Sequence, residues 1–159
     1  ILAKVNAAMT RDTRDHEFAT VFYGTLDAAT MRLTYCSAGH DPALLLRNGQ
    51  FSELTEGGTV VGVDAHSEYV KGLIDLKPSD VLLGYTDGVP DATNFDGQKF
   101  GRERIRQAVL YAADGTAQQI VNHVLWEVRR FIGLNQPADD ITLVAVKVSP
   151  DAAPPFSTT

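Results

Sequence analysis

The sequence has little cysteine, no long apolar run and no excess of basic charge, and each shortage narrows the class of protein. A single cysteine, Cys36, excludes an intrachain disulfide and a thiolate metal cluster and is typical of a reducing compartment. Apolar runs such as 81–83 are strand-sized, far below the ~20 residues of a membrane-spanning helix, so we expect no membrane insertion. Lys and Arg number 14 against 20 Asp and Glu, a net charge of -6 that disfavours nucleic-acid binding.

The composition is that of a folded domain. Of 159 residues, 44% are hydrophobic and 21% are charged, so the chain can bury a core and is not disordered as a whole. The length fits one domain, which we place at residues 1–149. Residues 150–159 hold three of the seven prolines and are predicted to be a disordered tail. Because the sequence does not begin with Met, we expect its numbering to begin inside a longer protein.

The order of predicted elements indicates an α+β fold with mostly antiparallel sheets. Apolar spacing predicts a helix over about 1–10, followed by a polar loop at 11–17. Runs of β-branched and aromatic residues predict strands at 18–26, 31–37, 42–47, 50–54, 68–76, 81–85 and 141–148. The first four strands are expected to form an antiparallel meander, with Asn48-Gly49 as a type I′ turn. The glycine-rich segment around 57–62 is predicted to be an irregular loop.

Two helices are predicted between the last two strands. The first is indicated by Ile105, Val109 and Ala112 on one face. The second begins with a capping box, Thr116 with Gln119, and ends at Gly133. We expect His123 on the polar side of this second helix.

Two acidic segments stand at the ends of predicted strands. Asp87 and Gly88 follow the strand 81–85, and Asp139 and Asp140 precede the strand 141–148. Carboxylates at strand ends suit hard divalent cations, and paired cations of this kind activate water and clamp a phosphoryl group. The same residues are also consistent with an ordinary Asp-Gly turn and a loop end, and such turns are common. The residues alone leave both interpretations open.

The segment Gly39-His40-Asp41-Pro42 is another candidate. A histidine there could act as a general acid or metal ligand, but such a residue more often fixes a tight turn by hydrogen bonding. Cys36 lies in a predicted strand and is expected to be a small core residue rather than a nucleophile. The sequence contains neither the glycine-rich phosphate loops of nucleotide-binding proteins nor the GxSxG motif of hydrolases.

Taken in order, six motifs resemble the metal-dependent protein phosphatase (protein phosphatase 2C) family, in its bacterial branch of stage II sporulation protein E and the sigma-B regulator phosphatases. They are 18–24 (FATVFYG), 33–42 (LTYCSAGHDP), 76–80 (LKPSD), 85–92 (YTDGVPDA), 100–101 (FG) and 139–143 (DDITL). The resemblance covers about residues 1–148. It implies an antiparallel β-sandwich flanked by helices in α-β-β-α layers, and a two-metal Mn²⁺ or Mg²⁺ centre in the complete domain.

The resemblance also implies roles for individual residues. The metal-binding aspartate of the YTDG motif corresponds to Asp87, with Gly88 turning the backbone beside the cation. The first aspartate of the DD motif, another ligand, corresponds to Asp139, and Asp140 is its more variable neighbour. Gly39 and His40 belong to a family hallmark that we expect to support the site structurally. No catalytic residue is expected beyond the metal ligands.

The sequence departs from the family pattern at its start. The family's first two strands, whose Gly-Asp motifs supply aspartates that bridge the metals, have no counterpart here. We therefore expect this chain to carry only part of the metal site, to be inactive alone, and to expose a sheet edge through which it could dimerise. Smaller departures at Asp41, Pro90 and Asp91 are expected to be tolerated.

The resemblance implies a cytoplasmic serine/threonine protein phosphatase in bacterial stress or developmental signalling. In that family a metal-activated water hydrolyses phosphoserine or phosphothreonine. The expected substrate is a phosphorylated anti-sigma-factor antagonist, and the expected upstream neighbour is a sensor or receiver domain. The alternative is a noncatalytic, phosphatase-like binding module that recognises a signalling partner.

Overall fold

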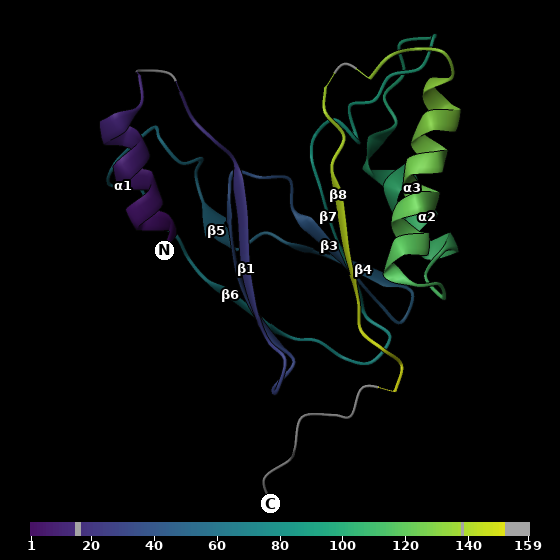
Figure 1. Ribbon diagram of the computed structural model, residues 1–159, viewed down its shortest axis with the longest axis horizontal. Coiled ribbons are helices and arrows are strands. Elements are labelled where there is room, and N and C mark those ends of the chain that lie inside the picture. Colours follow the sequence, from purple (N-terminus) through teal and green to yellow (C-terminus); the bar gives the residue numbers. More distant parts are fainter. Residues whose placement is uncertain (15–16, 138, 152–159) are drawn as a thin grey trace, which may run out of the picture. The chain divides into compact units, whose positions relative to one another are not determined.

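The computed structural model describes residues 1–14, 17–137 and 139–151 (Figure 1). The chain forms two compact units, and their sequence segments alternate. The first comprises Ile1–Ala43 and Glu53–Pro78, with the chain from Asp151; the second comprises Leu44–Ser52 and Ser79–Pro150. Most of the tail predicted at 150–159, namely residues 152–159, lies outside the described residues. None of the helices in the described part has the length and apolar character required to cross a membrane.

The first unit is built around strand β2 (Arg32–Ala38). One edge of β2 pairs antiparallel along its whole length with β1 (Val21–Asp27). The other edge pairs antiparallel with β6 (Gly72–Asp75) and then parallel with the short β5 (Gly57–Gly58). Helix α1 (Leu2–Asp12) belongs to this unit, and its Leu2 joins a small buried cluster with Cys36, Ala38 and Val61.

The second unit holds most of a four-stranded sheet in the order β4-β3-β7-β8; Ala43 of β3 and the last two residues of β4 fall in the first unit. Its strands are β4 (Gln50–Leu54), β3 (Ala43–Arg47), β7 (Val81–Tyr85) and β8 (Leu143–Lys147). Strand β7 pairs antiparallel with both of its neighbours, which places Leu83 opposite Leu44 on one side and Ala145 on the other.

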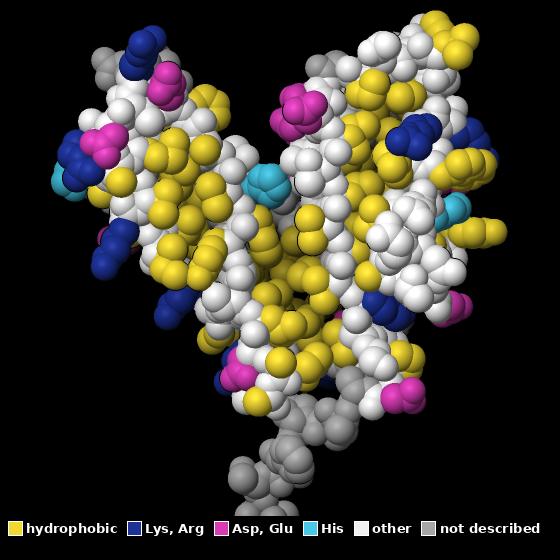
Figure 2. Space-filling model, viewed as in Figure 1, with side chains coloured by type: hydrophobic (Ala, Val, Ile, Leu, Met, Phe, Trp, Pro, Cys, Tyr) yellow, Lys and Arg dark blue, Asp and Glu magenta, His cyan; other side chains and the backbone are white. Residues whose placement is uncertain are grey.

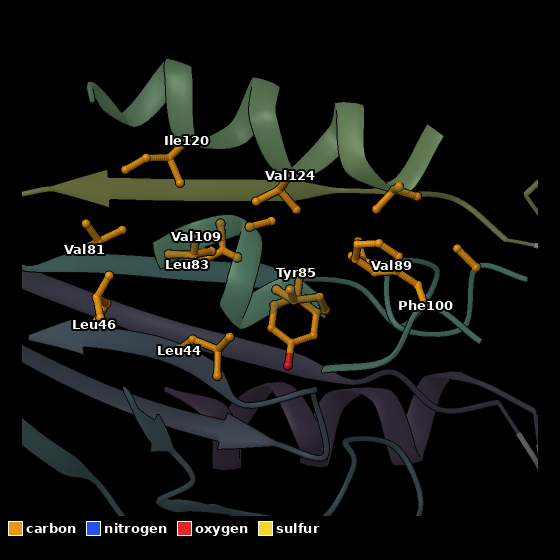
Figure 3. Close-up of a cluster of buried hydrophobic side chains, with 14 of the residues drawn as sticks. Leu44, Leu46, Val81, Leu83, Tyr85, Val89, Phe100, Val109, Ile120 and Val124 are labelled. Carbon is orange, nitrogen blue, oxygen red and sulfur yellow. The ribbon is translucent and has the colours of Figure 1, made fainter. Parts of the chain in front are cut away.

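Helices α2 (Gly101–Tyr111) and α3 (Ala117–Ile132) complete the second unit. Their apolar side chains and those of β3 and β7 point toward one another and form the core of this unit (Figure 3). The cluster has fifteen buried members: Leu44, Leu46, Val81, Leu83, Tyr85, Val89, Ala92, Phe100, Ile105, Ala108, Val109, Ile120, Val124, Val128 and Ile132. This core fixes the ends of β7 and β8, where the acidic segments lie.

The predicted α+β class with antiparallel sheets is confirmed. Strands β4 and β7 begin and end at the predicted residues. In α3 the capping box is present, because the Thr116 hydroxyl accepts from the Gln119 N–H and the Gln119 side chain accepts from the Thr116 N–H. Asn48 and Gly49 both have positive φ, as a type I′ turn requires.

Four predictions were wrong. Helix α1 continues through Arg11 and Asp12, which were predicted to lie in a loop. The strand predicted at 68–76 is limited to β6. The segment predicted as an irregular loop contains β5, which pairs closely with β2. This close pairing requires glycine at position 57, because a β-carbon there would overlap the Ser37 carbonyl. The first four strands are no single meander, because β3 and β4 belong to the other sheet.

Candidate metal centre

The two acidic segments meet at one edge of the second sheet. Strands β7 and β8 are antiparallel neighbours, and their last paired residues at this edge are Tyr85 and Leu143. Asp87 comes two residues after β7, and Asp140 comes three residues before β8. The end of one strand therefore lies beside the start of the other, although Asp87 and Asp140 are 53 positions apart in sequence.

Thr86 links the two acidic segments through hydrogen bonds. Its N–H donates to the Thr142 carbonyl at 3.1 Å. Its hydroxyl donates to the Asp140 carbonyl at 3.0 Å and accepts from the Thr142 N–H at 2.9 Å. These three bonds extend the pairing beyond the last strand residues. Thr86 was not among the site residues predicted from the sequence, although a hydroxyl side chain at a strand end directly before Asp87 was a signal for it.

Gly88 permits a close approach between the segments. It is buried, and a β-carbon at this position would stand 2.4 Å from the Asp140 carbonyl oxygen and 3.2 Å from the Asp139 carbonyl oxygen. The first distance is far below van der Waals contact with backbone atoms, which cannot move aside as a flexible side chain does. A residue with a side chain would therefore push the 139–140 segment away from the end of β7.

The turn that holds Asp87 is anchored in the core. The Val89 N–H donates to the Thr86 carbonyl at 3.0 Å, and the Asp91 N–H donates to the Asp87 carbonyl at 3.0 Å. Val89 itself is fully buried in the second unit's core, whereas Asp87 is exposed. The carboxylate of Asp87 therefore projects from a turn whose backbone is fixed by hydrogen bonds and by packing.

The donor atoms at this edge suit a hard cation in kind. Asp87, Asp139 and Asp140 are all exposed, and Asp139 Oδ1 accepts from the Asp140 N–H at 2.7 Å, which orients the Asp139 carboxylate. Carboxylate and carbonyl oxygens are the ligands that Mg²⁺ and Mn²⁺ prefer. Among the residues that the structure describes, however, no group of three or more His, Cys, Asp and Glu side chains is placed to hold a metal ion. The oxygen atoms at this edge are of the type that a hard cation prefers, but the described residues supply too few of them to hold one.

Gly39 and His40 lie in the first unit, directly after β2. Gly39 has a φ of 68°, and a β-carbon there would stand 2.4 Å from a Val60 methyl carbon, so this position favours glycine. His40 Nδ1 lies 3.0 Å from the Thr20 hydroxyl, and the Ser37 hydroxyl donates to the His40 carbonyl at 3.1 Å. These contacts are those of a hydrogen-bonded turn. A supporting role of Gly39 and His40 toward the metal centre stays a prediction.

Cys36 lies in β2 and is buried in the first unit. Burial raises the pKa of its thiol, so the reactive thiolate form is disfavoured. This environment is that of a small core residue.

Two curated proteins are similar to the chain. Protein IcfG of Synechocystis sp. is 34% identical over 130 residues, which is 81% of this chain and 20% of that protein. Phosphoserine phosphatase RsbU of Bacillus subtilis is 23% identical over 149 residues, which is 92% of this chain and 44% of RsbU. The chain thus spans less than half the length of either relative.

A solved structure and a family model also match this chain. The SiaA-PP2C domain of Pseudomonas aeruginosa has the same fold, with a TM-score of 0.82 at 18% identity; the match covers 93% of this chain and 59% of that one. The model described as "Stage II sporulation protein E (SpoIIE)" matches residues 1–149, which include both acidic segments. The chain therefore belongs to the SpoIIE family and is a PP2C-like phosphatase domain of the SpoIIE and RsbU type.

Proposed function

We propose that this chain is part of a metal-dependent protein phosphatase that hydrolyses phosphoserine or phosphothreonine. The observation that carries the proposal is the packing of Gly88 against the backbone of Asp139 and Asp140, which brings the two acidic family motifs together. When bound there, Mn²⁺ or Mg²⁺ supplies an activated water and a clamp for the phosphoryl group.

The residues of this chain hold and position the cation. Asp87 and Asp139 offer exposed carboxylate oxygens from two different strand ends. Thr86 keeps the two segments in register through its three hydrogen bonds, and Gly88 keeps them close. Ligand positions are therefore set by the backbone of a rigid sheet, which is how a binding site stays preorganised. The proposal requires further carboxylates, from outside residues 1–159, to complete the ligand set.

The proposed substrate is a phosphorylated anti-sigma-factor antagonist, dephosphorylated in the cytoplasm under the control of a sensor or receiver domain. The support is the membership of the SpoIIE family and the similarity to RsbU, a phosphoserine phosphatase. The net charge of -6 agrees with a protein substrate rather than a nucleic acid.

The first test is Mn²⁺-dependent hydrolysis of p-nitrophenyl phosphate by this chain and by the longer natural protein that contains it. We expect turnover in the longer protein alone, and loss of that turnover to the background rate in Asp87→Asn and Asp139→Asn. Asp114→Asn, which changes an exposed carboxylate in the same unit, is the matched control and should leave turnover unchanged.

Mn²⁺ binding, measured by calorimetry in the longer protein, separates loss of the metal from loss of chemistry. Asp87→Asn and Asp139→Asn should weaken binding, and Asp114→Asn should not. Full activity in either site variant would remove that residue from the metal centre. An absence of turnover in both unmodified proteins would favour the noncatalytic binding module.

A further inference from the structure

A groove of about 480 Å³ lies between helices α2 and α3, and none of its residues belongs to the candidate metal centre. Its walls combine aromatic rings with charged side chains. The members used below are Arg104, Tyr111, His123, Trp126, Glu127 and Arg130. In Figure 2, hydrophobic (yellow), histidine (cyan) and basic (dark blue) side chains lie together over these two helices.

Four of these side chains form one continuous stack. The Tyr111 ring lies on the His123 ring with centroids 4.7 Å apart, and the His123 ring lies on the Trp126 ring at 5.9 Å. The Arg130 guanidinium covers Trp126 at 4.7 Å from the ring centre. His123, which was predicted on the polar side of its helix, is not among the buried residues of α3 and lies half-buried between two aromatic rings.

The stack exposes much aromatic surface. Tyr111 is 82% exposed and Trp126 is 52% exposed. Large aromatic side chains are enriched where proteins bind other proteins, because each offers much contact area at a small cost in conformational entropy. These rings are exposed and already held in place by stacking, so they suit contact with another protein.

The two helices also differ in charge from the rest of the chain. Helices α2 and α3 contain five arginines and two glutamates and no other Asp, Glu or Lys, a net charge of +3. The whole chain carries -6, so all other residues together carry -9. The groove itself is lined by Arg104 and Arg130 against Glu127, a net charge of +1. A basic site on an otherwise acidic protein attracts acidic partners to itself.

The arginines are held in place before any partner binds. One nitrogen of Arg104, Nη1, donates to the Phe100 carbonyl at 2.8 Å, and its guanidinium lies 4.7 Å from the Phe131 ring centre. Arg130 Nη2 donates to Glu127 at 2.6 Å while the guanidinium stacks on Trp126. A guanidinium fixed in this way loses little further freedom on binding a carboxylate.

We propose that the groove between α2 and α3 binds an acidic segment of a partner protein. Carboxylates of that segment pair with Arg104 and Arg130, and its apolar side chains cover Tyr111 and Trp126. A nucleic acid fits less well, because the aromatic rings stack on one another rather than leaving slots for bases.

The test uses the 159-residue chain and two labelled peptides, one with repeats of Glu-Asp-Phe and one with repeats of Gln-Asn-Phe. Trp126 is the only tryptophan of the chain, so its emission reports on the groove itself. We expect saturable binding of the acidic peptide, seen by anisotropy, with a change in Trp126 emission. The neutral peptide should bind at least about tenfold more weakly, since the attraction is largely electrostatic.

Variants locate the site. Arg104→Ala and Arg130→Ala should each weaken acidic-peptide binding about tenfold, and Tyr111→Ser, at a largely exposed position that leaves the fold intact, about fivefold. Arg11→Ala removes the same charge from an exposed position on α1 and is the matched control; it should leave affinity unchanged. Equal weakening by Arg11→Ala, peptide binding without a change in Trp126 emission, or tighter binding of an oligothymidylate of equal charge would each overturn the proposal.

Discussion

The two units hold their helices by different means. In the second unit, α2 and α3 contribute seven side chains to the fifteen-member buried cluster. In the first unit, α1 has two buried residues, Leu2 and Asn6, and the cluster that Leu2 joins has four members. Helices α2 and α3 are thus stabilised by apolar burial that is spread over many residues. Helix α1 buries less apolar surface and depends more on polar contacts.

Asn6 shows how α1 is fixed. It is fully buried, its side-chain amide donates to the Asp64 carbonyl at 2.7 Å, and its side-chain oxygen accepts from the Gly62 N–H at 2.8 Å. A buried amide is stable when its donors and acceptors are satisfied and costly when they are not. The position of α1 thus depends in part on one buried amide with satisfied hydrogen bonds, whereas that of α3 depends on a buried apolar face.

The largest loss should come from the core of the second unit. Phe100 is buried there and meets the Phe131 ring edge to face at a centroid distance of 5.4 Å. Phe100→Ala removes that contact and leaves a cavity, so the free energy of unfolding should fall by about 3–5 kcal/mol in urea titrations. Phe95→Ala, at a position 72% exposed, is the control and should cost less than about 1 kcal/mol. Similar losses in both variants would contradict the importance of this core.

Each unit has a salt bridge with the same bidentate geometry, and these two bridges differ in how deeply they are buried. In the second unit Arg47 pairs with Asp80, whose side chain is 2% exposed, at 2.9 and 2.6 Å. In the first unit Arg32 pairs with Asp75 at 2.7 and 3.3 Å, and both side chains are more than half exposed.

Removing one partner of the buried pair leaves Arg47 partly buried without its carboxylate. Asp80→Ala should therefore cost about 3 kcal/mol in the free energy of unfolding. Asp75→Ala should cost at most about 1 kcal/mol, because water replaces the lost contact at the surface. Thermal unfolding of the two variants measures the difference, and equal shifts would show that burial does not separate the two bridges.

Asn6→Ala tests the polar anchoring of α1. The substitution leaves the Gly62 N–H and the Asp64 carbonyl without their side-chain partner, at a cost of about 1–3 kcal/mol. Amide hydrogen exchange should accelerate across α1 and stay unchanged in α3, because the contact acts on one unit. Asn122→Ala, an exposed asparagine of α3, is the matched control. Unchanged exchange in α1 would mean that its apolar contacts suffice.

Much of the second unit could be predicted from the sequence because its signals are local. The capping box of α3 and the Asn48-Gly49 turn each depend on residues a few positions apart, and the strand 81–85 is a short apolar run bounded by turn residues. The two acidic segments were also visible as strand-end carboxylates, and antiparallel pairing of their strands brought them to one edge.

The features that sequence reasoning missed depend on contacts between distant segments. Strand β5 exists because Gly57 lies against Ser37, and the tie of α1 to the loop near Asp64 depends on Asn6, 58 positions away in sequence. The sequence does not show the surroundings of His123, because they are set in part by Tyr111 on another helix. No local pattern carries such information.

The smallest loss in the free energy of unfolding should come from removing the N-cap of α3, a feature that the sequence predicts from neighbouring residues alone. Thr116 caps α3 through its hydroxyl, whereas Ile1, the residue before α1, makes no side-chain cap. Thr116→Ala should cost about 1 kcal/mol, and Thr116→Ser should restore most of it, because serine keeps the accepting oxygen. Since Ile120 and Val124 hold the following turns in the core, faster amide exchange should be confined to the first turn of α3, at the Gln119 N–H above all. Acceleration along the whole helix would mean that the cap, rather than the buried face, determines whether α3 forms.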